Sequence, residues 1–493
     1  MTQGRDGISL APMGARRLMG VARRLSVVAA VLVITALVAG SAGTSYAKSS
    51  KKKTSGGPVL LNSVVVSNQG ALFSGSLATF AAGSGSQSAP EFLVRGPASF
   101  LSVGPTLDSV SSLDSHIAVA LPADFVALTA PLGPPVGCGP FGPTLFGTGL
   151  VELFSPTSNG KSAPEAEICS PNFAVGAPNT TGIFFPQGVA FESPFDGVTP
   201  AGHETLAVAN EFPEVVQDGE ICAGAGLTAS ALGTITEYDR SALAPGLNNI
   251  PPTPNNPVAA VNVFTTPPTA YTQNSSIGGC LTSLAGPVSL AFDSNGFLFV
   301  VNNAGKFAAA FAALPRFISV FQQDAANTPN PPFSTGDVFP LALIGIAGTE
   351  TAGDVIQPVG ITVLTFGFED DLAFVTDVGD NSIKIFNPFT NPDPLIGFAF
   401  AGELVGTIHG GATKLKGPEG IALSADGDTL YVVNSKADSL EMFTDVPGIE
   451  DGGNISPTLI IQSGHSKLNL PVGVALPAFT PTPMETDGVL GAE

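Results

Sequence analysis

A short unit recurs through the C-terminal part of this chain, and it constrains the fold more than any other feature of the sequence. The most regular copy, Gly417 to Phe443, contains three apolar stretches separated by an Ala-Asp-Gly-Asp turn and by a second polar turn. An Asp-Gly pair between two apolar runs is a strong signal for a β-hairpin. This copy therefore predicts three consecutive antiparallel strands.

The same order of parts recurs along the chain. Apolar strands that open with proline begin the successive copies, at Pro186, Pro287, Pro358, Pro418 and Pro471. The second strand of a copy ends in a side-chain amide or carboxylate, at Asn210, Asn302, Asp377 and Asn434. A fourth strand is predicted before each new copy, at Val258–Phe264, Leu341–Ile346, Leu395–Phe400 (or Leu404–Ile408) and Thr458–Ile461. Repeated four-stranded units predict an all-β fold, a β-propeller.

The copy that begins at Pro471 contains one strand only, and its edge needs a partner for a ring to close. We expect N-terminal strands within about residues 58–85 to pair with it. That joint blade, one blade from about residues 91 to 180 and four clear copies within residues 186–476 make six. Six blades are therefore the expectation, with five or seven left open because the N-terminal third is weakly patterned.

The units resemble the NHL-repeat family of propellers. The family unit opens with Pro-x-Gly-Ile/Val-Ala, as at Pro418, and its third strand follows an Asn-x-Arg-Ile-x-Val-Phe pattern that is similar to the end of the segment Val375–Phe386. Ser289 departs from the pattern, because it stands where the unit has glycine. The resemblance implies a propeller fold and says little about function, since one fold serves many activities.

The N-terminus has the parts of an export signal. Residues 1–47 contain two arginine pairs, an apolar run from Leu25 to Gly40, and a small-residue cleavage site at Ser45–Ala47. These parts predict a cleaved signal peptide and an extracytoplasmic, periplasmic or secreted protein. The general and twin-arginine routes both remain open. An uncleaved anchor is the alternative, because the apolar run is nearly long enough to span a bilayer.

The rest of the chain is predicted to contain three segments. Residues 48–57 form a polar linker, residues 58–480 the propeller, and residues 481–493 a tail that is predicted to be disordered. No later segment is apolar for long enough to span a membrane, so we expect no span after signal cleavage. We also expect a monomer.

Charge and cysteine content narrow the classes of partner. The formal net charge is −21, and such a surface repels phosphate backbones, so no nucleic-acid partner is expected. The four cysteines, an even number in an exported protein, predict two disulfides. Two of them fall in insertions expected on one face of the ring, so we predict the pairs Cys222–Cys280 and Cys138–Cys169. None has a spacing suited to zinc.

The residues that end the second strands are the first candidates for ligand binding. Asn210, Asn302, Asp377 and Asn434 are expected to lie around one face of the ring, where their oxygens are of the kind that Ca²⁺ prefers. Capping of local turns by Asx hydrogen bonds explains the same residues, and it is the preferred interpretation.

The residues after the prolines are the second candidates, because they are expected to face the central channel. They are Gln187, Val288, Val359, Glu419 and Val472. Only Gln187 and Glu419 are polar, so the set of acidic and amide side chains around the metal of propeller lactonases is missing.

Two histidines complete the candidate set. His409 and His465 both precede a proline-initiated strand, and imidazoles there could bind zinc or carry protons near neutral pH. Exposed loop histidines are the preferred interpretation, and no metal site is predicted.

These features favour an exported propeller that binds a protein or small-molecule ligand through its loop-rich face and is not an enzyme. The alternative is a metal-dependent hydrolase or lyase whose site lies at the channel mouth. No cofactor is predicted, although Ca²⁺ stays open at the ring of Asn and Asp residues.

Overall fold

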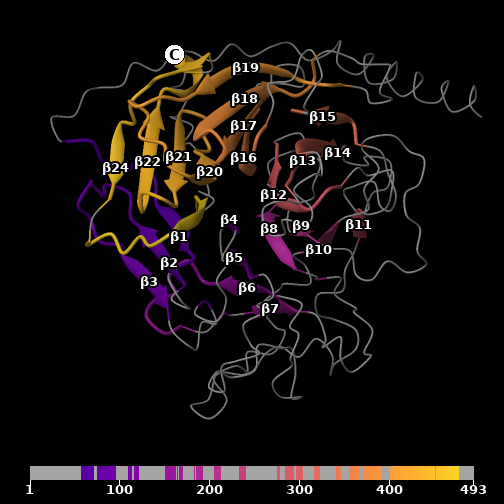
Figure 1. Ribbon diagram of the computed structural model, residues 1–493. Helices are drawn as coiled ribbons and strands as arrows, with labels where there is room; N and C mark the ends of the chain where they lie inside the picture. The colour runs from indigo at the N-terminus through magenta and orange to yellow at the C-terminus, as the bar shows by residue number, and fades with distance from the viewer. Residues whose placement is uncertain are drawn as a thin grey trace, which may run out of the picture. The chain divides into compact units, whose positions relative to one another are not determined.

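The computed structural model describes one compact unit of the chain, which lies within Ser55–Glu493. The described residues are 57–70, 75–95, 101, 109–113, 116–121, 150–162, 164, 166–169, 183, 185–191, 205–211, 233–239, 275–277, 284–293, 296–303, 316–321, 340–345, 355–365, 371–390, 400–449, 451–462 and 464–476. Their strands form six sheets, and Figure 1 shows the sheets arranged around a common centre.

The first sheet joins the two ends of the unit. Its order is β25-β1-β2-β3, in which the strands are β25 (Pro471–Ala475), β1 (Val64–Asn68), β2 (Ser76–Phe80) and β3 (Phe92–Arg95). β1 is antiparallel to β25, with Val66 opposite Val474. The predicted closure of the ring by N-terminal strands is confirmed.

The second and third sheets follow in chain order, and each is antiparallel throughout. The second contains β4 (Ser109–Leu113), β5 (His116–Leu121), β6 (Leu150–Phe154) and β7 (Ala166–Cys169). The third contains β8 (Pro186–Phe191), β9 (Thr205–Asn210), β10 (Thr234–Asp239) and β11 (Ser275–Ile277).

The remaining sheets repeat this pattern with shorter connections. The fourth contains β12 (Pro287–Phe292), β13 (Leu298–Asn302), β14 (Phe317–Phe321) and β15 (Ala342–Ile344). The fifth contains β16 (Pro358–Leu364), β17 (Leu372–Asp377), β18 (Ser382–Asn387), β19 (Glu403–Ile408) and the short β23 (Gly452–Gly453), which is parallel to β19. The sixth contains β20 (Pro418–Leu423), β21 (Thr429–Asn434), β22 (Ser439–Thr444) and β24 (Leu459–Ile461).

The predicted fourth strands agree with this order where they are described. Leu341–Ile346 contains β15, Thr458–Ile461 contains β24, and the second option for the fifth sheet, Leu404–Ile408, lies within β19. Val258–Phe264 lies outside the described residues, and the strand that pairs with β10 as the fourth strand of the third sheet is β11, Ser275–Ile277, which was not predicted.

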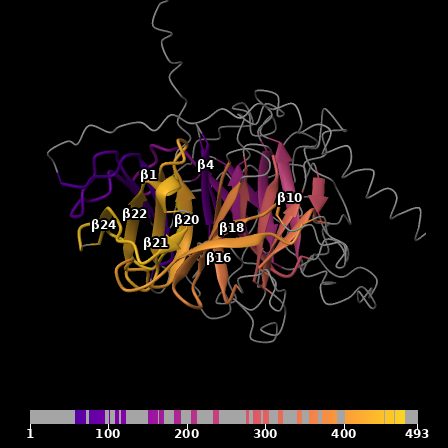
Figure 2. The same ribbon diagram turned by 90° about the horizontal axis from the view of Figure 1, so that it is seen from above.

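The first strand of each sheet lies nearest the centre and contacts the first strands of its two neighbours. The contacts run in a closed cycle, β4 to β8, β12, β16, β20, β25 and back to β4. In Figure 1 outer strands such as β7, β15 and β24 lie at the periphery, and in Figure 2 strands of the fifth and sixth sheets stand side by side. The described strands therefore form a propeller with six four-stranded blades, one of which carries an extra short strand.

Apolar side chains fill the spaces between the blades. Phe299 of the fourth blade and Phe386 of the fifth belong to one buried cluster, and Phe374 of the fifth and Leu430 of the sixth belong to another. Tyr431 of the sixth blade packs in a third cluster with residues of the first. Because each blade buries both faces against neighbours, its strands read as apolar runs instead of alternating patterns.

The glycines that follow the inner prolines are required by the close packing of neighbouring inner strands. A Cβ atom added at Gly188 would lie 2.8 Å from the backbone of β12, and one added at Gly420 would lie 2.7 Å from the backbone of β25. Real side chains do not tolerate such contacts, so the glycines let neighbouring inner strands approach closely. The strand register shifts at the same place in several inner strands, at Pro186/Gly188, Pro287/Ser289, Pro358/Ile361 and Pro418/Ile421.

Within the described part of the chain, no helix combines the length and the apolar character that crossing a bilayer requires.

Candidate functional site

The inner strands surround a cavity of about 270 Å³ on the central axis of the propeller. Five inner strands line it, namely β8, β12, β16, β20 and β25. Each of these strands is the last in its sheet, so no further strand of the described part of the chain pairs with its inner edge. Runs of consecutive residues line the cavity, such as Glu419–Leu423 and Val472–Leu476. The wall therefore offers backbone polar groups as well as side chains.

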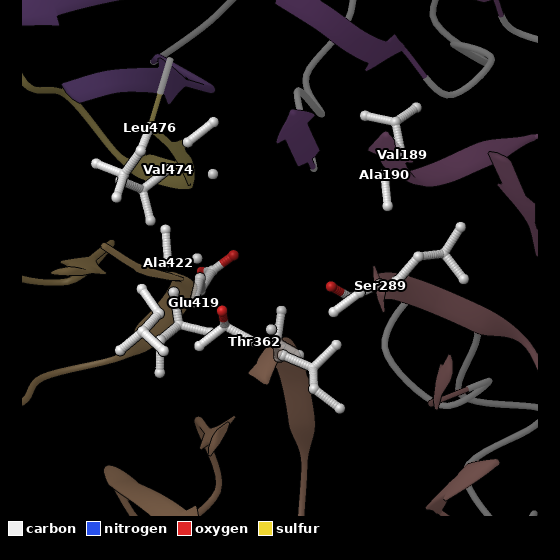
Figure 3. Close-up of a pocket in the computed structure, with 18 of the residues that line it drawn as sticks. Val189, Ala190, Ser289, Thr362, Glu419, Ala422, Val474 and Leu476 are labelled. Atoms are coloured by element: carbon white, nitrogen blue, oxygen red, sulfur yellow. The ribbon is translucent and has the colours of Figure 1, made fainter. Parts of the chain in front are cut away.

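Three polar side chains direct their oxygens into this cavity. Figure 3 shows the carboxylate of Glu419 together with the hydroxyl groups of Thr362 and Ser289. They come from three consecutive inner strands, β20, β16 and β12. Glu419 is the only charged side chain among the described residues that line the cavity. Most of the other lining side chains are aliphatic, as Val189 and Val474 illustrate.

The backbone at Glu419 is fixed by the preceding blade. The hydroxyl group of Thr376 in β17 donates a hydrogen bond to the carbonyl oxygen of Glu419 and accepts one from the amide of Gly360, at 2.8 Å. Gly360 has no side chain, and a Cβ there would clash with the Glu419 carbonyl. The carboxylate therefore projects from a rigid wall, which is the arrangement that a preorganised binding site needs.

The residues that end the second strands lie in the framework of the blades. Asn302 is fully buried, accepts a hydrogen bond from the Ala285 amide at 2.8 Å, and donates one to the Ser319 hydroxyl at 3.0 Å. Asn434 does the same with the Lys416 amide at 2.9 Å and the Ser439 hydroxyl at 3.3 Å.

Asp377 and Asn210 occupy corresponding positions. The Asp377 carboxylate accepts hydrogen bonds from the amides of Ile356, at 2.6 Å, and Gln357, at 2.8 Å. Asn210 donates to the Thr236 hydroxyl at 3.1 Å. Of these residues only Asp377 is shown to cap a turn of its own, through the amide of Gly379. Asn302, Asp377 and Asn434 chiefly hold the segment that enters the inner strand of the same blade.

A further residue of this kind was missed by sequence reasoning. Asn68, at the end of β1, accepts a hydrogen bond from the Asn469 amide at 3.1 Å and donates one to the Ser76 hydroxyl at 3.2 Å. Its signal was present, because an apolar strand ends in Asn at that point. We call Asn68, Asn302, Asp377 and Asn434 the entry clamps.

In two blades a buried ionisable residue of the third strand lies next to the entry clamp. Lys384 lies 3.8 Å from the carboxylate of Asp377, whereas Glu441 bonds to the neutral Asn434. Glu441 is only 1% exposed, and burial raises its pKa to about 7, although Asn434 and the positive charge of Lys414 oppose that rise. This carboxyl group lies in the sixth blade and does not line the cavity.

The residues that follow the inner prolines divide into two groups. Val359, Glu419 and Val472 line the cavity, as expected. Gln187 and Val288 do not: Gln187 is 1% exposed and donates a hydrogen bond from Nε2 to the carboxylate of Glu211 at 2.9 Å. The expectation that Gln187 faces the channel is therefore wrong, because Glu211 holds its side chain inside the third blade.

The two histidines are exposed and neither lines the cavity. His409 follows β19, with its Nδ1 atom 3.1 Å from the Thr407 carbonyl oxygen, and His465 lies between β24 and β25. Among the residues with described placement, no group of three or more His, Cys, Asp or Glu side chains is positioned to hold a metal ion.

The predicted disulfides stay predictions. Cys169 ends β7, while Cys138, Cys222 and Cys280 lie outside the described residues.

Comparisons with known proteins return distant structural matches. No family model matches the chain, and no curated protein is similar to it in sequence. The nidogen/laminin complex is 10% identical, with a TM-score of 0.39, over 85% of this chain and 98% of that chain. A functionally unknown protein from Desulfotomaculum acetoxidans is 14% identical, with a TM-score of 0.35, over 78% and 75% of the two chains. The periplasmic gluconolactonase of Pseudomonas aeruginosa is 15% identical, with a TM-score of 0.32, over 67% of each chain.

Proposed function

We propose that this chain is an exported propeller of the NHL type that binds a small-molecule ligand in the mouth of its central channel. The observation that carries the proposal is the cavity of about 270 Å³, whose wall combines aliphatic side chains, backbone polar groups and one carboxylate on a fixed backbone. Ligand sites are typically concave, and a few fixed polar groups in them orient the ligand. Glu419 directly follows Pro418, so the carboxylate lies at the channel end where connecting segments enter the inner strands. That end is the face expected to bind the ligand.

The polar residues at the ends of the second strands make hydrogen bonds within the blades, and this favours a binding function over a catalytic one. The oxygens of Asn302, Asp377 and Asn434 accept backbone hydrogen bonds in the fully buried framework. A catalytic acid or base must reach the proton that it transfers, and these groups are directed to the blade interior instead. The carboxylate of Glu419 and the hydroxyl groups of Thr362 and Ser289 face the cavity instead, where they form a recognition site.

The proposal is tested by screening small fragments against the purified protein with ligand-observed NMR. Thr362→Phe places an aromatic ring in the cavity, and we expect it to abolish the binding of fragments that the unsubstituted protein binds. Thr458→Phe is the matched control, since Thr458 is exposed beside the outer strand of the sixth blade. Fragments that bind equally to the Thr362→Phe protein, or a screen without hits, would overturn the proposal.

The metal-dependent alternative has its own measurement. Metal analysis of the purified protein that finds stoichiometric Ca or Zn, lost in the Glu419→Gln variant, would favour a hydrolase or lyase at the channel mouth. Export is tested separately, by N-terminal sequencing of the extracytoplasmic protein, and a mature N-terminus at Lys48 is the expected result.

A further inference from the structure

We propose that the loops at one end of the sixth blade bind an acidic polysaccharide through exposed lysine side chains. We call this surface the lysine patch, and it consists of residues 409–417, 435–438 and 462–470. None of these residues lines the central cavity. The inference therefore goes beyond the proposed function and is tested independently of it.

The three segments of the patch lie together, at the end of the blade where the chain enters the inner strands. One leads into β20, one connects β21 to β22, and one leads into β25. A Cβ added at Gly417 would lie 2.9 Å from the side chain of Lys436, so the first segment touches the second. The Leu470 amide donates a hydrogen bond to the carboxylate of Asp438 at 2.7 Å, which joins the second segment to the third. The patch is therefore one continuous surface.

Positive charge is concentrated on this surface. Acidic residues outnumber Lys and Arg by 40 to 19 in the whole chain, yet Asp438 is the only acidic residue in the three segments. Four lysines with exposed side chains lie there, namely Lys414, Lys416, Lys436 and Lys467. Within the described part of the chain, none of them forms an ion pair with an acidic side chain. Their charges are therefore available to an anionic ligand.

The opposite end of the same blade carries the opposite charge. Asp426 and Asp428 lie in the turn between β20 and β21, and Asp445 follows β22. The six residues of β21 separate the two ends by about 20 Å. Salt screens exposed charges over about 8 Å at physiological ionic strength. A ligand on the patch therefore interacts mainly with the lysines, even though the net charge of the chain is −21.

The backbone holds two of these lysines at equivalent positions. Lys414 and Lys467 each lie four residues before an inner proline, and both have a positive φ, of 62° and 59°. Positive φ is uncommon for residues other than glycine and costs free energy. The preceding residues, Thr413 and Ser466, each accept a hydrogen bond from the amide two residues further on. The same turn thus presents a lysine before two successive inner strands.

The composition of the patch favours a polysaccharide over a protein partner. Protein interfaces are enriched in aromatic residues, Met and Arg and depleted in Lys, and the three segments contain no Phe, Tyr, Trp, Met or Arg. Lysine is a flexible point charge, which suits carboxylates that are spaced along a chain. The exposed amides of Gln462 and Asn469 lie beside the lysines in sequence and can bond to hydroxyl groups. A polymer with both carboxylates and hydroxyl groups matches both kinds of side chain.

The test is biolayer interferometry of the purified protein on immobilised polygalacturonate, with dextran as the neutral polysaccharide. We expect saturable binding to polygalacturonate that weakens as salt is added, and no binding to dextran. The double variant Lys416→Gln/Lys436→Gln should bind polygalacturonate about fivefold more weakly. Its melting temperature should equal that of the unsubstituted protein, because both side chains are exposed.

Arg95→Gln/Lys161→Gln is the matched control, because both residues are exposed outside the sixth blade and the change in net charge is the same. It should leave the affinity for polygalacturonate unchanged. Absence of binding to polygalacturonate, or an equal loss in the two double variants, would overturn the inference. Equal affinity for polyglutamate would overturn it in favour of an acidic protein, and equal affinity for phosphatidylglycerol vesicles in favour of a membrane surface. The fragment screen of the cavity uses other ligands and another variant, so its failure would leave this inference standing.

Discussion

The buried carboxyl group of Glu441 couples the stability of the sixth blade to pH. Its pKa is about 7 in the folded protein, against an ordinary value of 4.5. The folded state therefore holds the proton more tightly than the unfolded state does. The contribution of Glu441 to the free energy of unfolding is fully present below about pH 4.5. It falls as the pH rises, and it is lost above about pH 7. Such a shift corresponds to about 3 kcal/mol at most.

Glu441→Gln tests this coupling. Glutamine mimics the protonated acid, so the variant should be more stable than the unsubstituted protein at about pH 8, by about 1–3 kcal/mol, and similar to it near pH 4.5. Urea unfolding across this pH range measures the difference. Glu403→Gln, at an exposed site, should leave the pH profile as it is. A variant that is equally destabilised at every pH would show that the carboxyl group is not the titrating group.

Gly420 shows at one residue why the inner strands carry glycine. A Cβ at this position would lie 2.7 Å from the Cα of Gly473 and from the amide of Val474, which are backbone atoms of β25. Gly420→Ala should therefore destabilise the protein by about 3 kcal/mol, at the upper end of the range for overpacking. Gly464→Ala is the control, because nothing lies within 4 Å of its added Cβ. Thermal unfolding of both variants decides the matter, and equal melting temperatures would refute the packing argument.

At the scale of the blade, the entry clamps join each second strand to the segment that leads into its inner strand. The last residue of the second strand is Asn or Asp. Its buried side chain accepts a hydrogen bond from the amide of the residue two places before the inner proline, as Asn302 does from Ala285.

Turn residues add links between neighbouring blades. Asn381 accepts a hydrogen bond from the Gly417 amide, and Asp438 accepts one from the Leu470 amide, both at 2.7 Å. The blades are thus connected at their inner ends by side chains that bond to main chain.

Asn68→Ala should remove one clamp and destabilise the protein by about 2 kcal/mol, because a buried hydrogen-bond network loses its centre. Asn469→Ala is the matched control: its backbone amide makes the bond to Asn68, while its side chain lies in an exposed position. It should change the unfolding free energy by less than about 0.5 kcal/mol. Chemical denaturation gives both values, and a comparable loss in the control would contradict the clamp.

Local features of the blades were predictable from the sequence, whereas contacts between distant residues were not. The inner three strands of the last four blades were predictable because their apolar runs, prolines and hairpin turns are local signals, whereas β11, the outer strand of the third blade, was not. The N-terminal strands of the first blade and the whole second blade lack the proline-glycine opening, so the sequence predicts them only as residue ranges, and β3, which falls in the range expected for the second blade, belongs to the first. The position of each Asn was predictable, but its partner was not, since Asn68 and Asn469 are 401 residues apart. Glu419 and Gln187 follow equivalent prolines, and only the neighbouring Glu211 explains why one faces the cavity and the other does not.

At the scale of the whole molecule, the pairing of β1 with β25 makes the ring continuous. In a repeat architecture each blade contacts only its neighbours, so opening the ring at one place exposes two blade faces together. β25 contributes Val474 to the cluster shared with the sixth blade and Val472 to the cluster shared with the second. Its loss would also leave the edge of β1 unpaired.

Truncation before Pro471 should therefore abolish cooperative unfolding and give an aggregating protein, because unpaired strand edges pair with other chains. Truncation after Thr480 removes only the predicted tail, and we expect its melting temperature and monomeric elution to equal those of the full chain. Circular dichroism melts and size-exclusion chromatography of the two proteins measure the difference. If the shorter protein melts as a cooperative monomer, the strand pairing at β25 is dispensable, and the channel wall that it forms beside Glu419 is dispensable to the fold as well.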